Sequence, residues 1–176
     1  MPEITNEVNM MLDPSKADPN MPPPEKFGVG DVTDLTWKNL LDAYTCTECG
    51  RCTSVCPANL TGKKLSPRKI MMDTRDRAEE LGQAKDQNGE DYHDGKSLHD
   101  YISEEELLAC TTCNACVEAC PVNIDPVDII FGMRQYQTLE KSAMPSEWAM
   151  MNSNIENNQA PWQFSPSDRA NWTKEI

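Results

Sequence analysis

Two runs of cysteines with identical spacing account for most of the chemistry available to this 176-residue chain. The spacing in both is C-x2-C-x2-C-x3-C-P, formed by Cys46, Cys49, Cys52 and Cys56 before Pro57 and by Cys110, Cys113, Cys116 and Cys120 before Pro121. Thiolates at this spacing ligate 4Fe-4S clusters, and the pattern is that of bacterial two-cluster proteins. Three closely spaced cysteines can surround one cubane, which carries its four irons at corners. The cysteines therefore predict two 4Fe-4S clusters and a role in electron transfer.

The fourth cysteine of each run predicts how the two runs are connected. In two-cluster proteins this cysteine ligates the opposite cluster. The predicted ligand sets are Cys46, Cys49, Cys52 and Cys120 for cluster 1, and Cys110, Cys113, Cys116 and Cys56 for cluster 2. Such crossed ligation would tie the two halves of the chain together. Pro57 and Pro121 lack an amide hydrogen and fix φ, so the chain should turn sharply as it leaves each cluster.

Zinc sites and a disulfide scaffold are the competing interpretations of the cysteines. Zinc often binds two C-x2-C pairs separated by a spacer, whereas here four cysteines crowd into each short run and a proline follows. A disulfide scaffold needs an oxidising compartment, and residues 1–26 are rich in proline and charge with no apolar run like that of a signal peptide. The chain contains no run of about 18 apolar residues, so no membrane span is predicted. We expect a cytoplasmic protein, with any membrane attachment made through a partner.

The charge of the chain limits its partners. The formal net charge of −13 argues against nucleic-acid binding, because like charges repel the phosphate backbone. From Arg51 to Lys69, however, the chain contains five basic residues and no acidic one. One side of the first cysteine run should therefore be positive, either as solvated surface or as a docking patch for an acidic partner. His93 and His99 are expected to be solvent-exposed rather than ligands.

Helical patterns flank both cysteine runs. The first helix is expected to begin near Thr33 or Asp34 and to lead into Cys46, with an apolar stripe at i, i+3, i+4 and i+7 formed by Trp37, Leu40, Leu41 and Tyr44. No segment alternates with period two, so the predicted fold class is mainly α.

Three further helices have start signals. Ser66 and Pro67 supply a cap and a first-position proline for a helix that should stop at Gly82, before an exposed loop over 82–100. Ser103 with Glu106 forms a capping box for a helix leading into Cys110, and Asp125 with Pro126 opens a helix that should reach about Glu140.

Three domains are predicted. Residues 1–27 should be an extended or disordered arm, because they offer little apolar surface to offset the entropy of ordering. Residues 28–140 should form the dicluster domain. Residues 141–176 should be an irregular tail whose aromatic side chains either pack on the helical body or dock against a neighbouring domain or subunit: Trp148, Trp162, Phe164 and Trp172.

The motifs resemble those of the heterodisulfide reductase-related iron-sulfur subunits and domains, a group that includes the iron-sulfur subunits of glycolate oxidase and anaerobic glycerol-3-phosphate dehydrogenase. The matching segments are YTCTECGRC (44–52), LSPR (65–68) and ACTTCNACVEACP (109–121). The resemblance implies the α-helical ferredoxin fold, with two clusters between two pseudo-repeated helical halves. It also implies electron transfer between a flavoprotein or ferredoxin and a second site, often a domain with CCG motifs.

This chain has no CCG motif and no Rossmann-type glycine fingerprint, so substrate chemistry is expected to lie elsewhere. The leading hypothesis is an electron-transfer subunit or domain of a heterodisulfide reductase-like or flavin-linked oxidoreductase. A freestanding dicluster ferredoxin-type carrier is the alternative. An iron-sulfur sensor protein is the third hypothesis, although the chain lacks a basic recognition helix.

Overall fold

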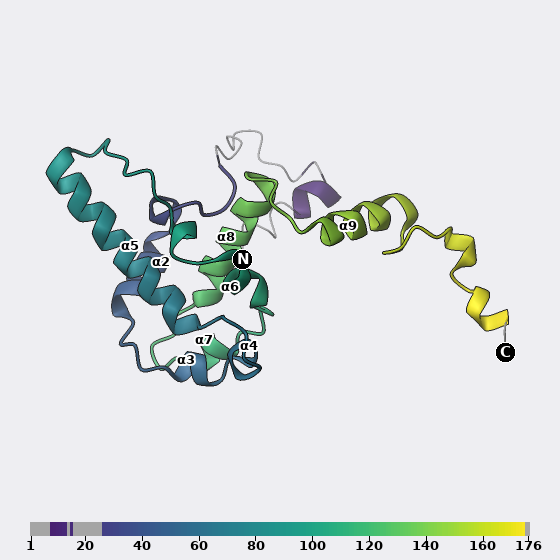
Figure 1. The fold of residues 1–176 in the computed structure, drawn as a ribbon, viewed down its shortest axis with the longest axis horizontal. Coiled ribbons are helices and arrows are strands. Elements are labelled where there is room, and N and C mark those ends of the chain that lie inside the picture. Colours follow the sequence, from purple (N-terminus) through teal and green to yellow (C-terminus); the bar gives the residue numbers. More distant parts are fainter. Residues whose placement is uncertain (1–7, 14, 16–25, 175–176) are drawn as a thin grey trace. The chain divides into compact units, whose positions relative to one another are not determined.

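The computed structural model describes residues 8–13, 15 and 26–174, so most of the predicted arm lies outside the described residues. Every regular element in the described part is helical, which confirms the mainly α prediction (Figure 1). The chain divides into one compact unit that ends at Glu140 and a second formed by Lys141–Ile176. No helix in the described part is both long enough and apolar enough to cross a membrane.

Helix α2 (Trp37–Thr45) leads into the first cysteine run, as predicted, but begins later than expected. A 3₁₀ turn, η2 (Val32–Asp34), precedes it, and Thr36 caps it by accepting a hydrogen bond from the Asn39 backbone N–H. The predicted apolar stripe faces outward: the exposed fractions are 77% for Trp37, 51% for Leu41 and 52% for Tyr44. Of the four residues in the stripe, only Leu40 is partly buried against the core, so the stripe is not the buried face of the helix.

Polar contacts explain why α2 buries its other face. The Asn39 side-chain amide donates to Asp128 at 2.8 Å, and the Asp42 carboxylate accepts the Asp125 backbone N–H at 3.1 Å. Ala43 is fully buried and lets α2 approach its neighbours closely. These bonds tie α2 to the start of the last long helix of the domain, and they outweigh the apolar pattern.

The first cysteine run continues into α3 (Arg51–Ser54), α4 (Pro57–Leu60) and the long α5 (Pro67–Asn88). The predicted cap is confirmed, because the Ser66 side chain accepts from the Lys69 backbone N–H. Gly82 does not stop the helix. Apart from the neighbouring residues and backbone of its own helix, nothing lies within 4 Å of where its Cβ would be, so it is an open helix position where glycine costs only about 1 kcal/mol. The end comes at Gly89, with φ of 99°.

The second half repeats this arrangement with η3 (Leu98–Asp100), α6 (Glu104–Ala109), α7 (Ala115–Glu118) and α8 (Pro126–Leu139). Both predicted start signals are confirmed. The capping box of Ser103 and Glu106 is complete, and the Asp125 side chain accepts from two backbone N–H groups at the start of α8.

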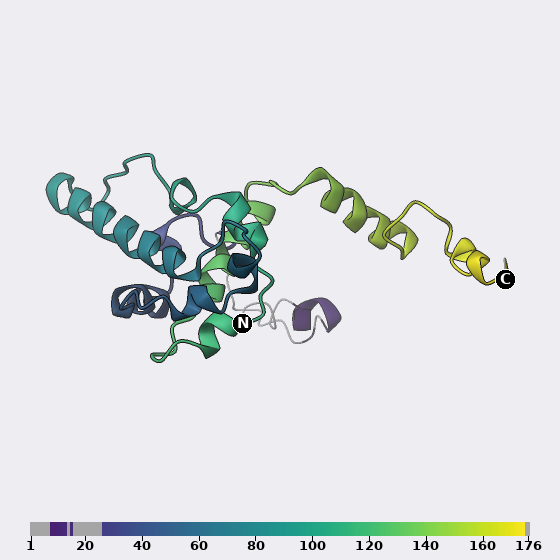
Figure 2. The same cartoon turned by 60° about the horizontal axis from the view of Figure 1, so that its bottom comes forward.

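Helices α5 and α8 supply much of the core, and Figures 1 and 2 show α5 and α8 with α2, α3 and α7 gathered around them. Ile70 and Met71 of α5 and Ile129, Ile130 and Met133 of α8 are each at most 1% exposed. Burying a side chain of this size stabilises the fold by roughly 1.5–3 kcal/mol, so the two helices hold the cysteine runs on a rigid support.

The segment that precedes η2 crosses α8 closely. The Val29 N–H donates to the Gly132 carbonyl oxygen at 2.8 Å. Gly28 has φ of 73°, and a Cβ on it would lie 2.3 Å from the same oxygen, so only glycine fits there. His99 contributes to this junction: its Nε2 lies 3.1 Å from the Val29 carbonyl oxygen, and its ring centroid is 5.3 Å from that of Tyr136. The expectation of a solvent-exposed His99 was wrong.

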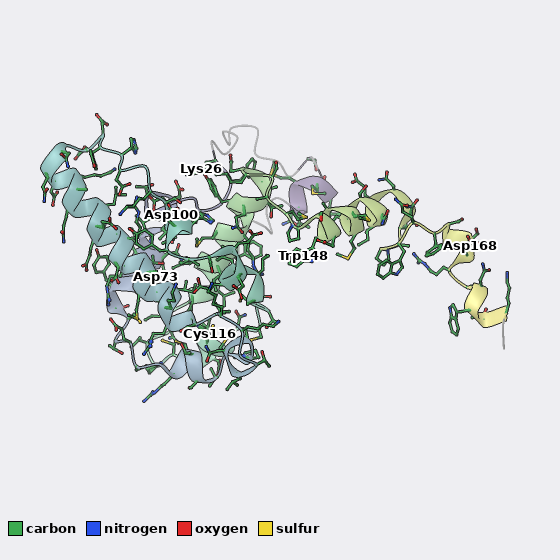
Figure 3. All side chains as sticks on the ribbon, viewed as in Figure 1. Lys26, Asp73, Asp100, Cys116, Trp148 and Asp168 are labelled. Atoms are coloured by element: carbon green, nitrogen blue, oxygen red, sulfur yellow. The ribbon has the colours of Figure 1, made fainter. Side chains whose placement is uncertain are left out.

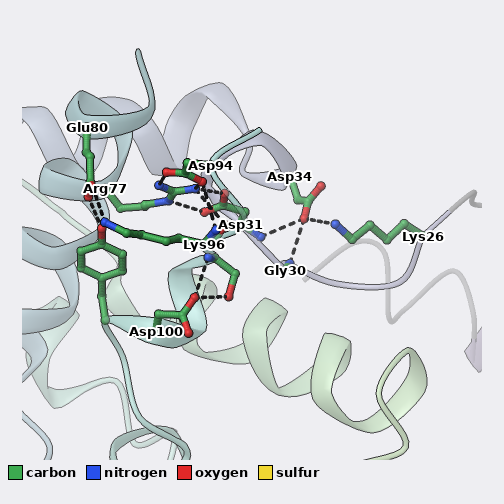
Figure 4. A network of polar contacts seen from close by, with 11 residues as sticks. Lys26, Gly30, Asp31, Asp34, Arg77, Glu80, Asp94, Lys96 and Asp100 are labelled. Atoms are coloured by element: carbon green, nitrogen blue, oxygen red, sulfur yellow. Dashed lines mark hydrogen bonds and ion pairs between the residues drawn. The ribbon is translucent and has the colours of Figure 1, made fainter. Parts of the chain in front are cut away.

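A buried arginine joins three segments of the domain (Figure 4). Arg77 of α5 is 1% exposed and donates to both oxygens of Asp31 at 3.0 and 2.7 Å, to both of Asp94 at 2.5 and 3.0 Å, and to the Lys96 carbonyl at 2.9 Å. The hydrogen bonds from Arg77 lower the pKa of Asp94 to about 2. The loop that follows α5 is thereby fixed to the helix, as is the segment before η2.

The second unit is not irregular throughout, as the prediction had it. It contains α9 (Ser146–Asn158) and two 3₁₀ turns, η4 (Pro166–Asp168) and η5 (Asn171–Lys174). Its aromatic side chains are largely exposed, including the labelled Trp148 in Figure 3. A role for these side chains in docking or in packing on the helical body stays a prediction.

Candidate iron-sulfur centres

Cysteines of both runs gather around a first hollow, here called hollow 1. Five cysteines line it: Cys46, Cys49, Cys52, Cys116 and Cys120. The hollow is thus lined by the first three cysteines of one run and the last two of the other. Three charged side chains also line it, those of Glu48, Arg51 and Arg68.

A second hollow, hollow 2, shares Cys116 with hollow 1; Cys116 is labelled in Figure 3. Four cysteines line it: Cys56, Cys110, Cys113 and Cys116. The rest of its lining is mostly apolar and includes Leu65, Val127 and Ile130, with no charged side chain among the described residues. The structure therefore brings all eight predicted ligands to two adjacent hollows.

Left-handed backbone at matching positions shapes both runs. Glu48 and Thr112, each just before the second cysteine of its run, have φ of 58° and 54°. Gly50 and Asn114, each just after that cysteine, have φ of 81° and 59°. Alternating backbone of this kind turns successive N–H groups to one side and forms a concavity suited to an anion, which a thiolate-ligated cluster is. The sequence did not predict the left-handed conformation of Glu48 and Thr112, although both occupy equivalent places in the two runs.

Backbone N–H groups already point at two of the sulfurs. The Thr112 N–H donates to the Cys110 Sγ, and the Ile124 N–H donates to the Cys120 Sγ, both at 3.4 Å. Hydrogen bonds to cluster sulfurs are among the features that set a cluster's potential.

The electrostatics of the thiols fit a site that receives metal. Burial, helped by the neighbouring Cys110, raises the pKa of the Cys116 thiol to about 12, and burial also raises the pKa of Cys52. The pKa of exposed Cys113 is lowered by the Ala115 backbone N–H and then by Thr111. Buried thiols become thiolates when metal cations compensate their charge.

The donor set is the one that iron-sulfur clusters require. All eight cysteines are free thiols in the structure. Among the described residues no group of three or more His, Cys, Asp or Glu side chains is arranged to hold a single metal ion. The thiols instead surround two hollows, and a cubane has its irons at separate corners rather than at one point.

An arginine at the same helix position supports each run. Arg75 and Arg134 are the ninth residues of α5 and α8. Arg134 donates to the Leu107 carbonyl at 2.9 Å and to the Cys110 carbonyl at 2.6 Å, whereas Arg75 forms an ion pair with Glu48 at 2.9 Å. The pseudo-repeat therefore extends to the groups behind the cysteines.

A family model described as a 4Fe-4S dicluster domain matches residues 45–124, which contain both runs. The chain is 34% identical to a probable iron-sulfur-binding oxidoreductase, FadF, of Bacillus subtilis, over 86% of this chain and 26% of that protein. It is 31% identical to one subunit of the ferredoxin/F(420)H(2)-dependent CoB-CoM heterodisulfide reductase of Methanosarcina acetivorans, over 60% of this chain and 52% of that protein.

The chain belongs to the heterodisulfide reductase-related iron-sulfur proteins. Like them it is a two-cluster protein, with two 4Fe-4S clusters as its cofactors. Another relative is the EtfAB:quinone oxidoreductase of Syntrophomonas wolfei, 32% identical over 89% of this chain and 25% of that protein. This heterodisulfide reductase-related protein thus spans about a quarter of the length of the longer relatives it matches.

Proposed function

We propose that this chain conducts electrons one at a time through two 4Fe-4S clusters, as a subunit or domain of a heterodisulfide reductase-like or flavin-linked oxidoreductase. The observation that carries the proposal is the convergence of thiols from both runs on two adjacent hollows. When bound, each cluster supplies a site that accepts and releases one electron. The protein supplies position, N–H donors and a surrounding of low polarity.

Crossed ligation is part of the proposal. Cluster 1 would be held by Cys46, Cys49, Cys52 and Cys120, and cluster 2 by Cys110, Cys113, Cys116 and Cys56. Cys116 also lines hollow 1, but its place as third cysteine of the second run assigns it to cluster 2. The lining of the hollows supports this division because the last cysteine of each run lines the hollow formed mainly by the other run, Cys120 in hollow 1 and Cys56 in hollow 2.

The redox partners would be a flavoprotein, a ferredoxin or a CCG-domain subunit, and the compartment the cytoplasm. Ferredoxin occurs in the name of the Methanosarcina relative, which supports that class of partner. Membrane attachment, where it exists, would be made through a partner.

Anaerobic reconstitution with iron and sulfide tests the cluster count. We expect about eight irons per chain and two paramagnetic signals after reduction with dithionite. A content of about four irons or fewer, with one signal, contradicts the proposal.

Serine substitutions test the pairing of ligands. Cys56→Ser should change the same paramagnetic signal as Cys113→Ser, whereas Cys49→Ser should change the other signal. The reciprocal variant, Cys120→Ser, should match Cys49→Ser. If Cys56→Ser instead matches Cys49→Ser, each cluster is ligated by one run and the crossed assignment is wrong.

A further inference from the structure

Four cations in the described part of the chain have no ion pair and no side-chain hydrogen bond: Arg51, Lys63, Arg68 and Lys85. The protein has a net charge of −13, so carboxylates outnumber cations and an arginine without a carboxylate partner is unexpected. Arg51 and Arg68 are exposed, and both line hollow 1. The one acidic side chain in that lining, Glu48, is bound by Arg75.

The rim of hollow 1, defined here as Arg51, Arg68, Cys49, Pro121 and Val122, also exposes apolar surface. Val122 is 53% exposed, and Cys49 and Pro121 are exposed as well. A small apolar centre beside cationic side chains is the composition of many protein interfaces, where arginine is enriched and lysine is depleted. The lining of hollow 2 has no charged residue, so the two hollows present different surfaces.

We propose that the rim of hollow 1 is the docking surface for an acidic electron-transfer protein, and that electrons enter or leave the chain through cluster 1. This inference rests on the proposed function, because it assumes a cluster in hollow 1. An acidic partner is repelled by most of this acidic protein and attracted at the rim, which orients the encounter. Anionic membranes and nucleic acids fit the surface less well, since their extended charge would meet the surrounding carboxylates.

The test compares two double variants that remove the same charge. Arg51→Gln with Arg68→Gln removes the rim cations, and Lys63→Gln with Lys85→Gln removes two unpaired cations elsewhere. Neither breaks an ion pair of the described structure. Rates are measured by stopped-flow bleaching with reduced flavodoxin, an acidic flavoprotein, as donor, and with basic cytochrome c as acceptor.

With flavodoxin we expect the arginine variant to react about tenfold more slowly at low ionic strength, because electrostatic steering contributes at least that factor to association. Its rate should depend less on salt than that of the unmodified protein. The lysine variant should stay within about twofold of the unmodified protein. Oxidation by cytochrome c should not slow in either variant. The salt dependence separates docking from any change in cluster potential.

Iron content and paramagnetic signals are measured on every sample. Absence of the two signals in the unmodified protein defeats the proposed function itself. With both clusters intact, the docking proposal alone is overturned by equal rate losses in the two variants, by a loss with cytochrome c, or by arginine-dependent sedimentation with phosphatidylglycerol vesicles in place of a flavodoxin effect.

Discussion

Replacing Arg77 by methionine should be among the most damaging single changes in this domain. The change removes five hydrogen bonds and leaves two carboxylates without their cation, Asp31 and Asp94, whose side chains are only 18% and 14% exposed. Breaking a buried ion pair from one side costs about 3–5 kcal/mol. Because both carboxylates keep some contact with water, we expect the lower end, about 3 kcal/mol.

The assay measures the rate of unfolding, because proteins that lose a cofactor when they unfold do so irreversibly. Cluster absorbance is followed after transfer to guanidinium under argon, over a series of concentrations extrapolated to water. About 3 kcal/mol corresponds to about a hundredfold faster unfolding if the network is absent from the transition state for unfolding.

Arg75→Met is the matched control, because it lies two residues earlier on the same helix. Its ion pairs with Glu48 and Asp76 are partly exposed to water and are worth about 0–1 kcal/mol. Adding Asp31→Asn and Asp94→Asn to Arg77→Met should restore part of the loss, because no unpaired charge then remains. Unfolding of Arg77→Met at a rate within about threefold of Arg75→Met would refute the reasoning.

Two other predictions use the same assay. Gly28→Ala and Gly62→Ala place alanine at nearly the same φ, 73° and 79°, but only Gly28 faces backbone atoms. Gly62→Ala should cost about 1 kcal/mol and Gly28→Ala at least about 3 kcal/mol, and equal losses would show that the close crossing is relieved elsewhere. Leu107→Ala should cost about 2–5 kcal/mol because Leu107 is fully buried, whereas Leu41→Ala, on the exposed stripe, should stay within about 0.5 kcal/mol. A large loss at Leu41 would mean that the stripe is covered in solution.

Local signals predicted the helix starts well. Ser66, Ser103 and Asp125 each satisfy backbone N–H groups two or three residues further on, so their effect does not depend on the rest of the fold. The cysteine runs could equally be recognised from the sequence, because the geometry of the cluster imposes the spacing of its ligands.

Features set by distant contacts were not predictable from local patterns. The apolar stripe of α2 faces outward because Asn39 and Asp42 bond to residues more than 80 positions away. His99 was expected at the surface but lies against Val29 and Tyr136, which are far from it in sequence. Tertiary contacts of this kind override helical periodicity.

The backbone of the cysteine runs was unpredictable for another reason. Gly50 and Asn114 are residue types that tolerate positive φ, but Glu48 and Thr112 are not usual there. Only the packing of two turns around a hollow requires that conformation. Residue preferences could not identify this conformation, whereas a comparison of the two runs position by position could have done so.

Cys116 forms part of the partition between the two hollows. Charge added on one side of this partition is poorly screened on the other, because the intervening material is protein rather than water. An electron on either centre should therefore make it less favourable to add an electron to the other. This is a negative coupling in the thermodynamic sense. A donor that releases its electrons in pairs would therefore deliver them to the two centres one after the other.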